Sequence, residues 1–276
     1  MKKLIYILFF LVSGVYAQDI GFLERLRQEL VQTYTPLPDV PFLAQAEVVI
    51  HRDSYYGSIG QIVNNQDDII AEIRSVVQGH IGLPVGGNYT IRIASDGAIE
   101  MQQVNGVHYS LGEPPGLDFK DGNVNDTYTI FIRMGEVLSP SDGTIISKAG
   151  NSARQYYVIA NNTTFFVQAH GQTSNTTEDL LNISKPYNLH VEVGNTSGSF
   201  IKYINGVVSG SAATASTAVN DVDVRIGARS STDTAAGAGS FYGTGSIRGI
   251  IIYRTTFNAT DTQIILDWMD TYLDEP

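Results

Sequence analysis

Short apolar runs separated by turn residues fill the second half of the chain. They lie at Tyr128–Met134, Thr144–Lys148, Gln155–Ala160, Thr164–His170, Asn188–Val193, Phe200–Ile204, Val222–Ala228 and Ile247–Arg254. Many short strands at such spacing are typical of an antiparallel sandwich or jelly roll. The sequence therefore predicts a mostly β fold, with an antiparallel β-sandwich of jelly-roll type over residues 116–276.

The first 41 residues combine a leader pattern, a helical stripe and prolines. Lys2 and Lys3 precede an apolar run that ends at Val12, and Ala17 stands before Gln18. This order predicts a signal peptide over residues 1–17, and hence export; a short uncleaved membrane anchor is the alternative. Residues 18–41 read as an amphipathic helix followed by a proline-rich linker, the apolar stripe being Leu23, Leu26, Leu30 and Tyr34.

Residues 42–115 read as a small α+β region. Asn65 is a suitable cap for a helix over residues 66–78, which Gly79 would end. Three short strands follow, with hairpin turns expected at Asp96-Gly97 and Asn105-Gly106. Two arrangements fit this pattern: a separate unit bounded by "GEPPG" at 112–116, or the first strands of one larger sheet protein with a helical insertion.

Composition excludes several classes of function. The chain has 276 residues, no cysteine and a formal net charge of −11. Without basic clusters, binding to nucleic acid or to anionic lipid is not expected. Without cysteine, disulfides, thiolate metal sites and cysteine nucleophiles are excluded.

The stretch "SFYGTGSIRGIIIYRTTF", residues 240–257, superficially resembles a phosphate-binding glycine loop. Arg248 stands where the third glycine belongs, and the β-branched run Ile250–Ile252 follows instead of a helix. We therefore interpret the stretch as a turn that leads into a buried strand. A C-terminal helix is predicted over Asp261–Leu273, with a capping box of Thr260 and Gln263 and with Trp268 packed on the sheet.

The same C-terminal residues resemble the last strand and helix of laminin G-like, concanavalin A-like jelly rolls. Three upstream pieces agree in order: "GLDFKDG" at 116–122, "KYINGVV" at 202–208 and "VRIGAR" at 224–229. Tyr187 stands where the family usually has a tryptophan. The resemblance covers about residues 116–273 and implies a lectin-like sandwich that presents ligand-binding loops at one rim.

Catalytic signatures are absent from the sequence. Glu136 and Glu192 have no acidic partner at strand spacing, and Asp221 and Asp223 alternate at the start of a strand, where solvated acids are ordinary. The five histidines form no zinc motif, and no G-x-S-x-G elbow occurs. We expect no enzyme activity.

Binding is the better-supported expectation, because several loops combine aromatic with hydrogen-bonding residues. The candidate ligand-binding residues are Asn151, Arg154, Tyr156, Tyr157, Asn162, Arg229 and Tyr242. The resemblance adds a rim Ca²⁺ as a further expectation, with Asp142 and Asp233 as its candidate ligands.

Three hypotheses about function follow. The first is an exported, non-catalytic recognition or adhesion protein whose jelly roll binds a glycan or glycoprotein. The second is a structural or assembly protein of a cell surface or virion, attached through its N-terminal segment. The third is a glycoside hydrolase with atypical carboxylates.

Overall fold

The computed structural model of the protein describes residues 36–86, 91–95, 97–101, 107–113, 115–117, 127–136, 143–150, 154–160, 164–169, 172–177, 185–194, 199–213, 222–232, 239–240 and 245–274. The chain divides into Met1–Leu37 and a compact unit, Pro38–Pro276, to which the following description applies. The predicted signal peptide and N-terminal helix lie outside the described residues.

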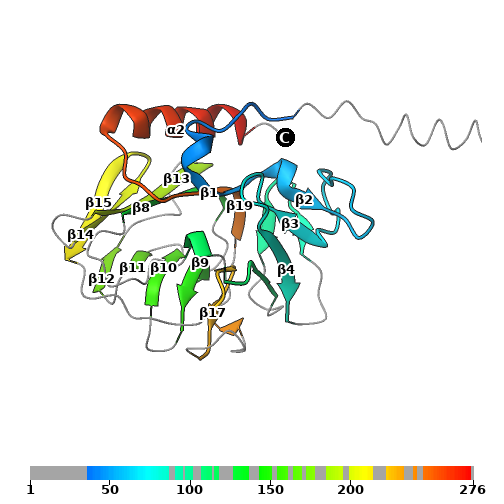
Figure 1. Ribbon diagram of the computed structural model, residues 1–276, viewed down its shortest axis with the longest axis horizontal. Coiled ribbons are helices and arrows are strands. Elements are labelled where there is room, and N and C mark those ends of the chain that lie inside the picture. The colour runs from blue at the N-terminus through cyan, green and yellow to red at the C-terminus, as the bar shows by residue number, and fades with distance from the viewer. Residues whose placement is uncertain are drawn as a thin grey trace, which may run out of the picture. The chain divides into compact units, whose positions relative to one another are not determined.

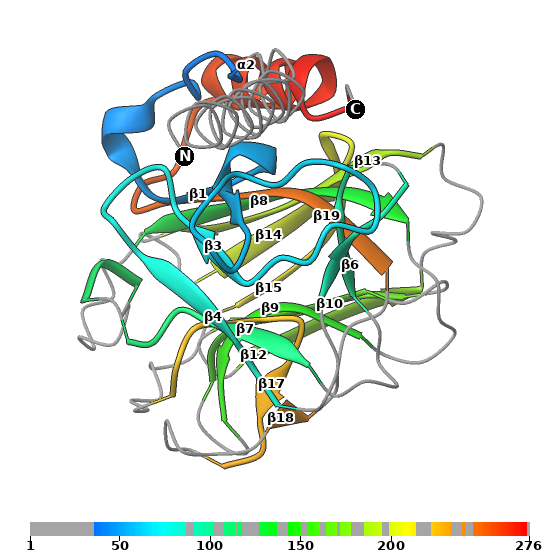
Figure 2. The same cartoon turned by 90° about the vertical axis from the view of Figure 1, so that its right-hand side faces the viewer.

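Two antiparallel sheets form a sandwich, which confirms the predicted fold class (Figures 1 and 2). The first sheet has eight strands in the described residues: β1 (Ala46–Ile50), β5 (Arg92–Ile93), β6 (Ile99–Met101), β8 (Tyr128–Glu136), β13 (Tyr187–Gly194), β14 (Ser199–Ile204), β15 (Val207–Ala213) and β19 (Gly245–Tyr253). Their order is β15-β14-β13-β8-β19-β6-β5, with β1 also paired to β19.

The second sheet has nine strands in the same described residues. They are β2 (Tyr55–Tyr56), β3 (Glu72–Arg74), β4 (Ile81–Val85), β7 (His108–Ser110), β9 (Gly143–Ala149), β10 (Arg154–Ala160), β11 (Thr164–Ala169), β12 (Gln172–Thr177) and β16 (Arg225–Ile226). Their order is β12-β11-β10-β9-β16-β7-β4-β3-β2. Strands from residues 42–115 thus lie in both sheets, beside strands from the later part of the chain.

The remaining elements are short, except for one helix. Strands β17 (Arg229–Ser230) and β18 (Gly239–Ser240) pair with each other, and the 3₁₀ turns are η1 (Leu43–Gln45), η2 (Arg52–Ser54) and η4 (Pro115–Leu117). Helix α2 (Ala259–Tyr272) lies over the outer face of the eight-stranded sheet (Figure 1).

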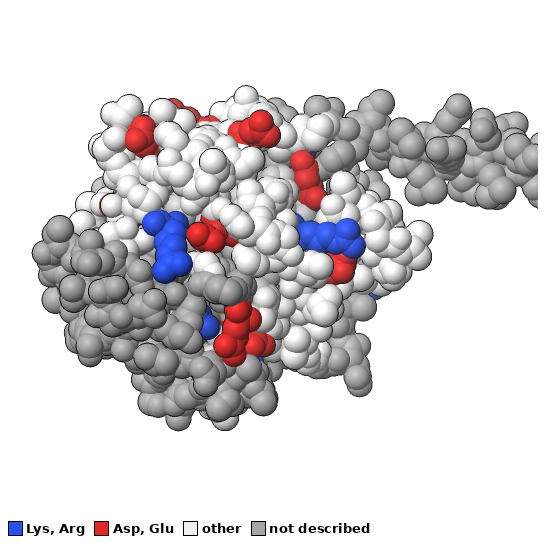
Figure 3. Space-filling view, viewed as in Figure 1, with Lys and Arg blue, Asp and Glu red and all other residues white. Residues whose placement is uncertain are grey.

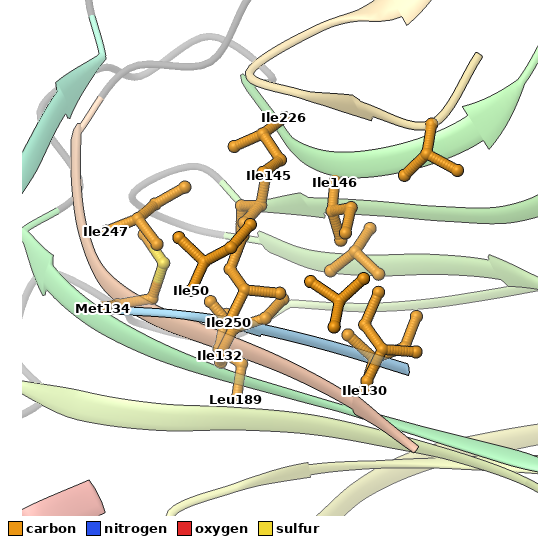
Figure 4. Close-up of a cluster of buried hydrophobic side chains, with 14 of the residues drawn as sticks. Ile50, Ile130, Ile132, Met134, Ile145, Ile146, Leu189, Ile226, Ile247 and Ile250 are labelled. Carbon is orange, nitrogen blue, oxygen red and sulfur yellow. The ribbon is translucent and has the colours of Figure 1, made fainter. Parts of the chain in front are cut away.

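The core fills the space between the sheets with β-branched and aromatic side chains. Figure 4 shows the part formed by Ile50, Ile130, Ile132, Met134, Ile145, Ile146, Leu189, Ile226, Ile247 and Ile250. Strand β19 is buried on both faces, because Ile250 and Ile252 enter this core while Tyr253 packs against Phe131 on the side of α2. This double burial explains why its sequence is a continuous apolar run rather than an alternating one.

The helix predicted over residues 66–78 is wrong. Ile73 pairs with Gly82 in the nine-stranded sheet, and the Ile70 N–H donates to Ile91 O at 3.0 Å. Asn65, the proposed cap, instead donates its N–H to Asp68 Oδ2 in a local turn. Among the residues at the predicted helical spacing, Ile73 is paired in a strand and Ile69 forms an isolated bridge with Arg92, so tertiary contacts override the local period.

The predicted hairpin turns at Asp96-Gly97 and Asn105-Gly106 include residues that lie outside the described ones. In the motif "KYINGVV", Asn205 and Gly206 have φ of 48° and 74°, as a type I′ hairpin between β14 and β15 requires. Helix α2, however, begins one residue before Thr260: Asn258 is its cap and accepts from the Asp261 N–H at 2.9 Å. The predicted capping box is therefore wrong in position, although the helix and the burial of Trp268 are confirmed.

Candidate functional site

One cross-strand row of side chains runs along the outer face of the nine-stranded sheet. Its members are direct register partners on adjacent strands, in the order Leu83, Ser110, Arg225, Ser147, Tyr157 and Gln168. Directly paired residues project to the same face of an antiparallel sheet. Their chain neighbours Tyr109, Ile226 and Val158 belong to the core, so this row, which we call the outer row, faces away from it.

Strand β17 covers the middle of the outer row. The Ser147 hydroxyl donates to Ala228 O at 2.8 Å, and the Arg229 guanidinium carbon lies 5.5 Å from the Tyr157 ring centroid. Tyr157 is 2% exposed and Arg229 8% exposed. Figures 1 and 2 show β17 on the side of this sheet that faces away from the other sheet. A ligand in solution therefore does not reach the Tyr157 ring in this structure.

The row is open where it meets β4. Ile81, Leu83 and Val85 are 48%, 54% and 44% exposed and alternate along this strand, so they form an apolar strip. Beside the strip, the half-buried Ser110 donates its hydroxyl to Asp223 Oδ2 at 2.6 Å. We call these five residues the open end. It combines an apolar surface with a fixed hydrogen-bonding group, the composition typical of small-ligand sites.

The charged and titratable groups beside the open end, on the same face of the sheet, are buried. His108 lies opposite Val85 in the register, and burial, reinforced by the Arg225 guanidinium and opposed by the Asp223 carboxylate, lowers its pKa to about 4. The imidazole is therefore neutral at pH 7. Arg225 is 2% exposed. The site thus presents Asp223 to solvent, whereas the neighbouring Arg225 and His108 on the same face are shielded from it.

The predicted ligand-binding residues are distributed over very different positions. Tyr157 and Arg229 are brought together as a stacked pair, whereas Tyr156 points into the core, 5.9 Å from the Tyr128 ring centroid. Tyr156 therefore does not face a ligand at the outer row. Asn151, Asn162, Tyr242, the Arg154 side chain, and the calcium candidates Asp142 and Asp233 lie outside the described residues.

Sequence reasoning missed most of the open end. It treated Asp223 only as half of a carboxylate pair with Asp221, which lies outside the described residues. Residues Ile81, Leu83 and Val85 look like ordinary core positions, because an alternating apolar strand does not reveal which face is covered. The available signal was the alternation of polar and apolar residues in "HYS", residues 108–110. It predicts that Ser110 lies on the opposite face of the strand from Tyr109, which is a core residue.

Metal and membrane signatures were examined over the part of the chain that the structure describes. That part contains no group of three or more His, Asp or Glu side chains arranged to hold a metal ion. It also contains no helix long and apolar enough to span a bilayer. In the view of Figure 3, basic and acidic residues of the described surface are scattered rather than gathered into one patch.

Comparison with known proteins supports the fold alone. No protein-family model and no curated protein sequence matches the chain. Among solved structures, a botulinum neurotoxin type C structure, reported for cell entry that depends on two ganglioside molecules, has a TM-score of 0.51 at 14% identity and covers 81% of this chain and 51% of its own. A botulinum neurotoxin DC binding domain in complex with SialylT has a TM-score of 0.50 at 12% identity, covering 81% of this chain and 51% of its own.

A third similar structure is an enzyme. A mutant Trypanosoma rangeli sialidase that displays trans-sialidase activity has a TM-score of 0.52 at 8% identity and covers 87% of this chain and 35% of its own. The chain thus spans about half the length of the toxin structures and about a third of the sialidase. Together the three matches show a β-sandwich fold.

Proposed function

We propose that the protein is an exported, non-catalytic recognition protein that binds a glycan at the open end of the outer row. The observation that carries the proposal is the meeting of the exposed apolar strip of β4 with the Ser110–Asp223 hydrogen bond. Sugars present apolar C–H surfaces and hydroxyl donors, and the open end offers a partner for each. The laminin G-like resemblance of residues 116–273 belongs to the same proposal.

The structural neighbours support a carbohydrate ligand. By their descriptions, the toxin structures interact with gangliosides or bind SialylT, and the third neighbour is a sialidase. The proposal transfers only the ligand type, glycans, to this chain. It assigns no catalytic role, because the open end contributes a single carboxylate.

A glycan array probed with the full chain, with and without Ca²⁺, tests this function. We expect selective binding to a group of related glycans. Reducing-sugar release from the bound glycans should stay at the level of a no-protein control. Silence against every glycan would contradict the recognition role, and sustained sugar release would replace it with hydrolysis.

A second candidate function, an assembly module of a cell surface or virion, is favoured by the distribution of exposed apolar residues. Seven of the ten large hydrophobic residues that are exposed in the described part lie within residues 59–85. They are Ile59, Ile62, Ile69, Val76, Ile81, Leu83 and Val85. This stretch of the chain thus supplies most of the exposed apolar side chains of the described part, and exposed apolar patches are typical of interaction sites.

Light scattering coupled to size-exclusion chromatography distinguishes assembly from glycan recognition. The full chain would be compared with a double variant, Ile59→Ser with Ile62→Ser, which changes two exposed residues outside the open end. An oligomer that dissociates in this variant would support assembly. A monomer in both proteins would leave glycan recognition as the function.

A further inference from the structure

We infer that the open end selects neutral oligosaccharides and discriminates against acidic ones. This inference rests on the proposed function and names the ligand class of the same site. It differs from a simple transfer of ligands from the structural neighbours, whose descriptions name gangliosides and a sialidase.

The accessible charge at the open end is negative. Asp223 is half-buried, whereas Arg225 and Arg229 are 2% and 8% exposed and His108 is buried and neutral. Arg74, the register partner of Ile81, is an accessible cation on this face, and it already pairs with Glu72 and stacks on Tyr56. A ligand carboxylate beside Asp223 would therefore meet a like charge, while Arg74 is already engaged by Glu72 and Tyr56.

The hydrogen-bonding pattern requires donors from the ligand. A carboxylate only accepts hydrogen bonds, and the Ser110 hydroxyl occupies Asp223 Oδ2. Within the described part of the chain, nothing donates to Oδ1. Ser110 Oγ in turn accepts from the Gly112 N–H at 3.2 Å, so both partners are held in place. Hydroxyl groups of a sugar satisfy Oδ1, whereas carboxylate, sulfate and phosphate groups lack the necessary donor when ionised.

The apolar strip indicates an extended ligand. Residues two apart on a strand are separated by roughly 6.8 Å, so the strip from Ile81 to Val85 is about 14 Å long. Leu83, at its centre, is the register partner of Ser110. An oligosaccharide lying along β4 therefore covers the strip with its C–H faces and directs a hydroxyl group of a central sugar to Asp223.

The test compares a neutral oligosaccharide with the same oligosaccharide carrying a terminal sialic acid. Pairs of this kind on a glycan array, followed by calorimetric titration of the best pair, give the ratio of the two affinities for the full chain. We expect the neutral member to bind at least tenfold more tightly. In Asp223→Asn, neutral binding should weaken about tenfold and the ratio should fall below about threefold, because the like-charge repulsion is removed.

Two further variants serve as controls. Asp267→Asn makes the same charge change on the exposed face of α2 and should leave both affinities unchanged. Leu83→Ser should weaken neutral and sialylated ligands equally, since it reduces the apolar strip without altering charge.

The outcomes distinguish failure of the inference about neutral ligands from failure of the proposed glycan-binding function. Equal or tighter binding of the sialylated member by the full chain would overturn the inference while glycan recognition stands. Unchanged binding in Asp223→Asn would also overturn it. Failure of every neutral and acidic glycan would instead overturn the proposed function itself.

Discussion

Gly249 shows how one residue decides the contact between a strand and a helix. It lies in β19, and a Cβ at this position would be 2.6 Å from Leu273 Cδ1 and 3.2 Å from the carbonyl oxygen of Ile50. The end of the C-terminal helix and strand β1 therefore both approach this point of the strand closely, so that an added methyl group would force Leu273 to move. Its φ is not positive, so the requirement is for space rather than for backbone freedom.

Gly249→Ala is expected to lower the free energy of unfolding by about 1–3 kcal/mol, the usual cost of overpacking. Urea denaturation measures this change. The double variant Gly249→Ala with Leu273→Ala provides the control, because removing the Leu273 methyl groups relieves the clash. The two substitutions should then be non-additive, with the double variant more stable than the sum of the single changes predicts. Strict additivity would show that the Leu273 contact is not the cause.

At the scale of elements, helix α2 depends on the sheet for its electrostatic balance. The helix contains Asp261, Asp267 and Asp270 and has no basic residue in its last turn, although a helix C-terminus favours cations. The sheet supplies these cations. Arg133 of β8 pairs with Asp270 at 2.6 Å and also with Asp274, and Arg248 of β19 contacts Asp274 at 3.3 Å.

Replacing Arg133 with Met should release the last turns of α2. The arginine side chain is 5% exposed, and its loss leaves Asp270 and Asp274 without their main partner, at a cost of about 2 kcal/mol. Hydrogen exchange followed by mass spectrometry should show faster exchange over residues 266–274. Asp267→Asn, on the exposed face of the same helix, should leave exchange unchanged. Faster exchange in both variants would indicate general helix instability.

At the scale of the whole molecule, three buried histidines make stability depend on pH. Burial lowers the pKa of His51 and His108 to about 4, aided in each case by a neighbouring arginine, and lowers that of His190 to about 3. In the unfolded chain a histidine binds its proton near pH 6.5. Between pH 6.5 and about 4 the unfolded state therefore holds more protons than the folded state, so the protein loses stability as pH falls through this window.

The free energy of unfolding should fall by up to about 1.4 kcal/mol per pH unit for each of these histidines between pH 6.5 and 4. Glu192 opposes this trend, because burial raises its pKa and the folded state then takes up its proton first. Urea titrations at pH 7, 6 and 5 measure the net slope. His108→Gln should reduce that slope, and a slope equal to that of the unsubstituted protein would show that His108 titrates normally when folded.

Local pattern was sufficient for much of the fold. The β-branched strand at Ile250–Ile252 and the C-terminal helix are each specified by residues close in sequence, and each was predicted. The Asn205-Gly206 turn is specified locally in the same way. Failures occurred where local and long-range preferences disagree. The apolar residues within 66–78 have helical spacing, but Ile73 pairs with Gly82, and this part of the chain forms a strand instead.

The candidate site could be identified almost only from the tertiary structure. Composition and motifs pointed to an acidic, cysteine-free sandwich, and they selected Tyr157 and Arg229, which the fold then stacks together and covers. The open end joins Leu83, Ser110 and Asp223, which are far apart in the chain and meet only through the β4-β7-β16 register. Periodicity along a chain identifies which side chains share a face, but only the packing of other elements determines which face remains exposed to solvent.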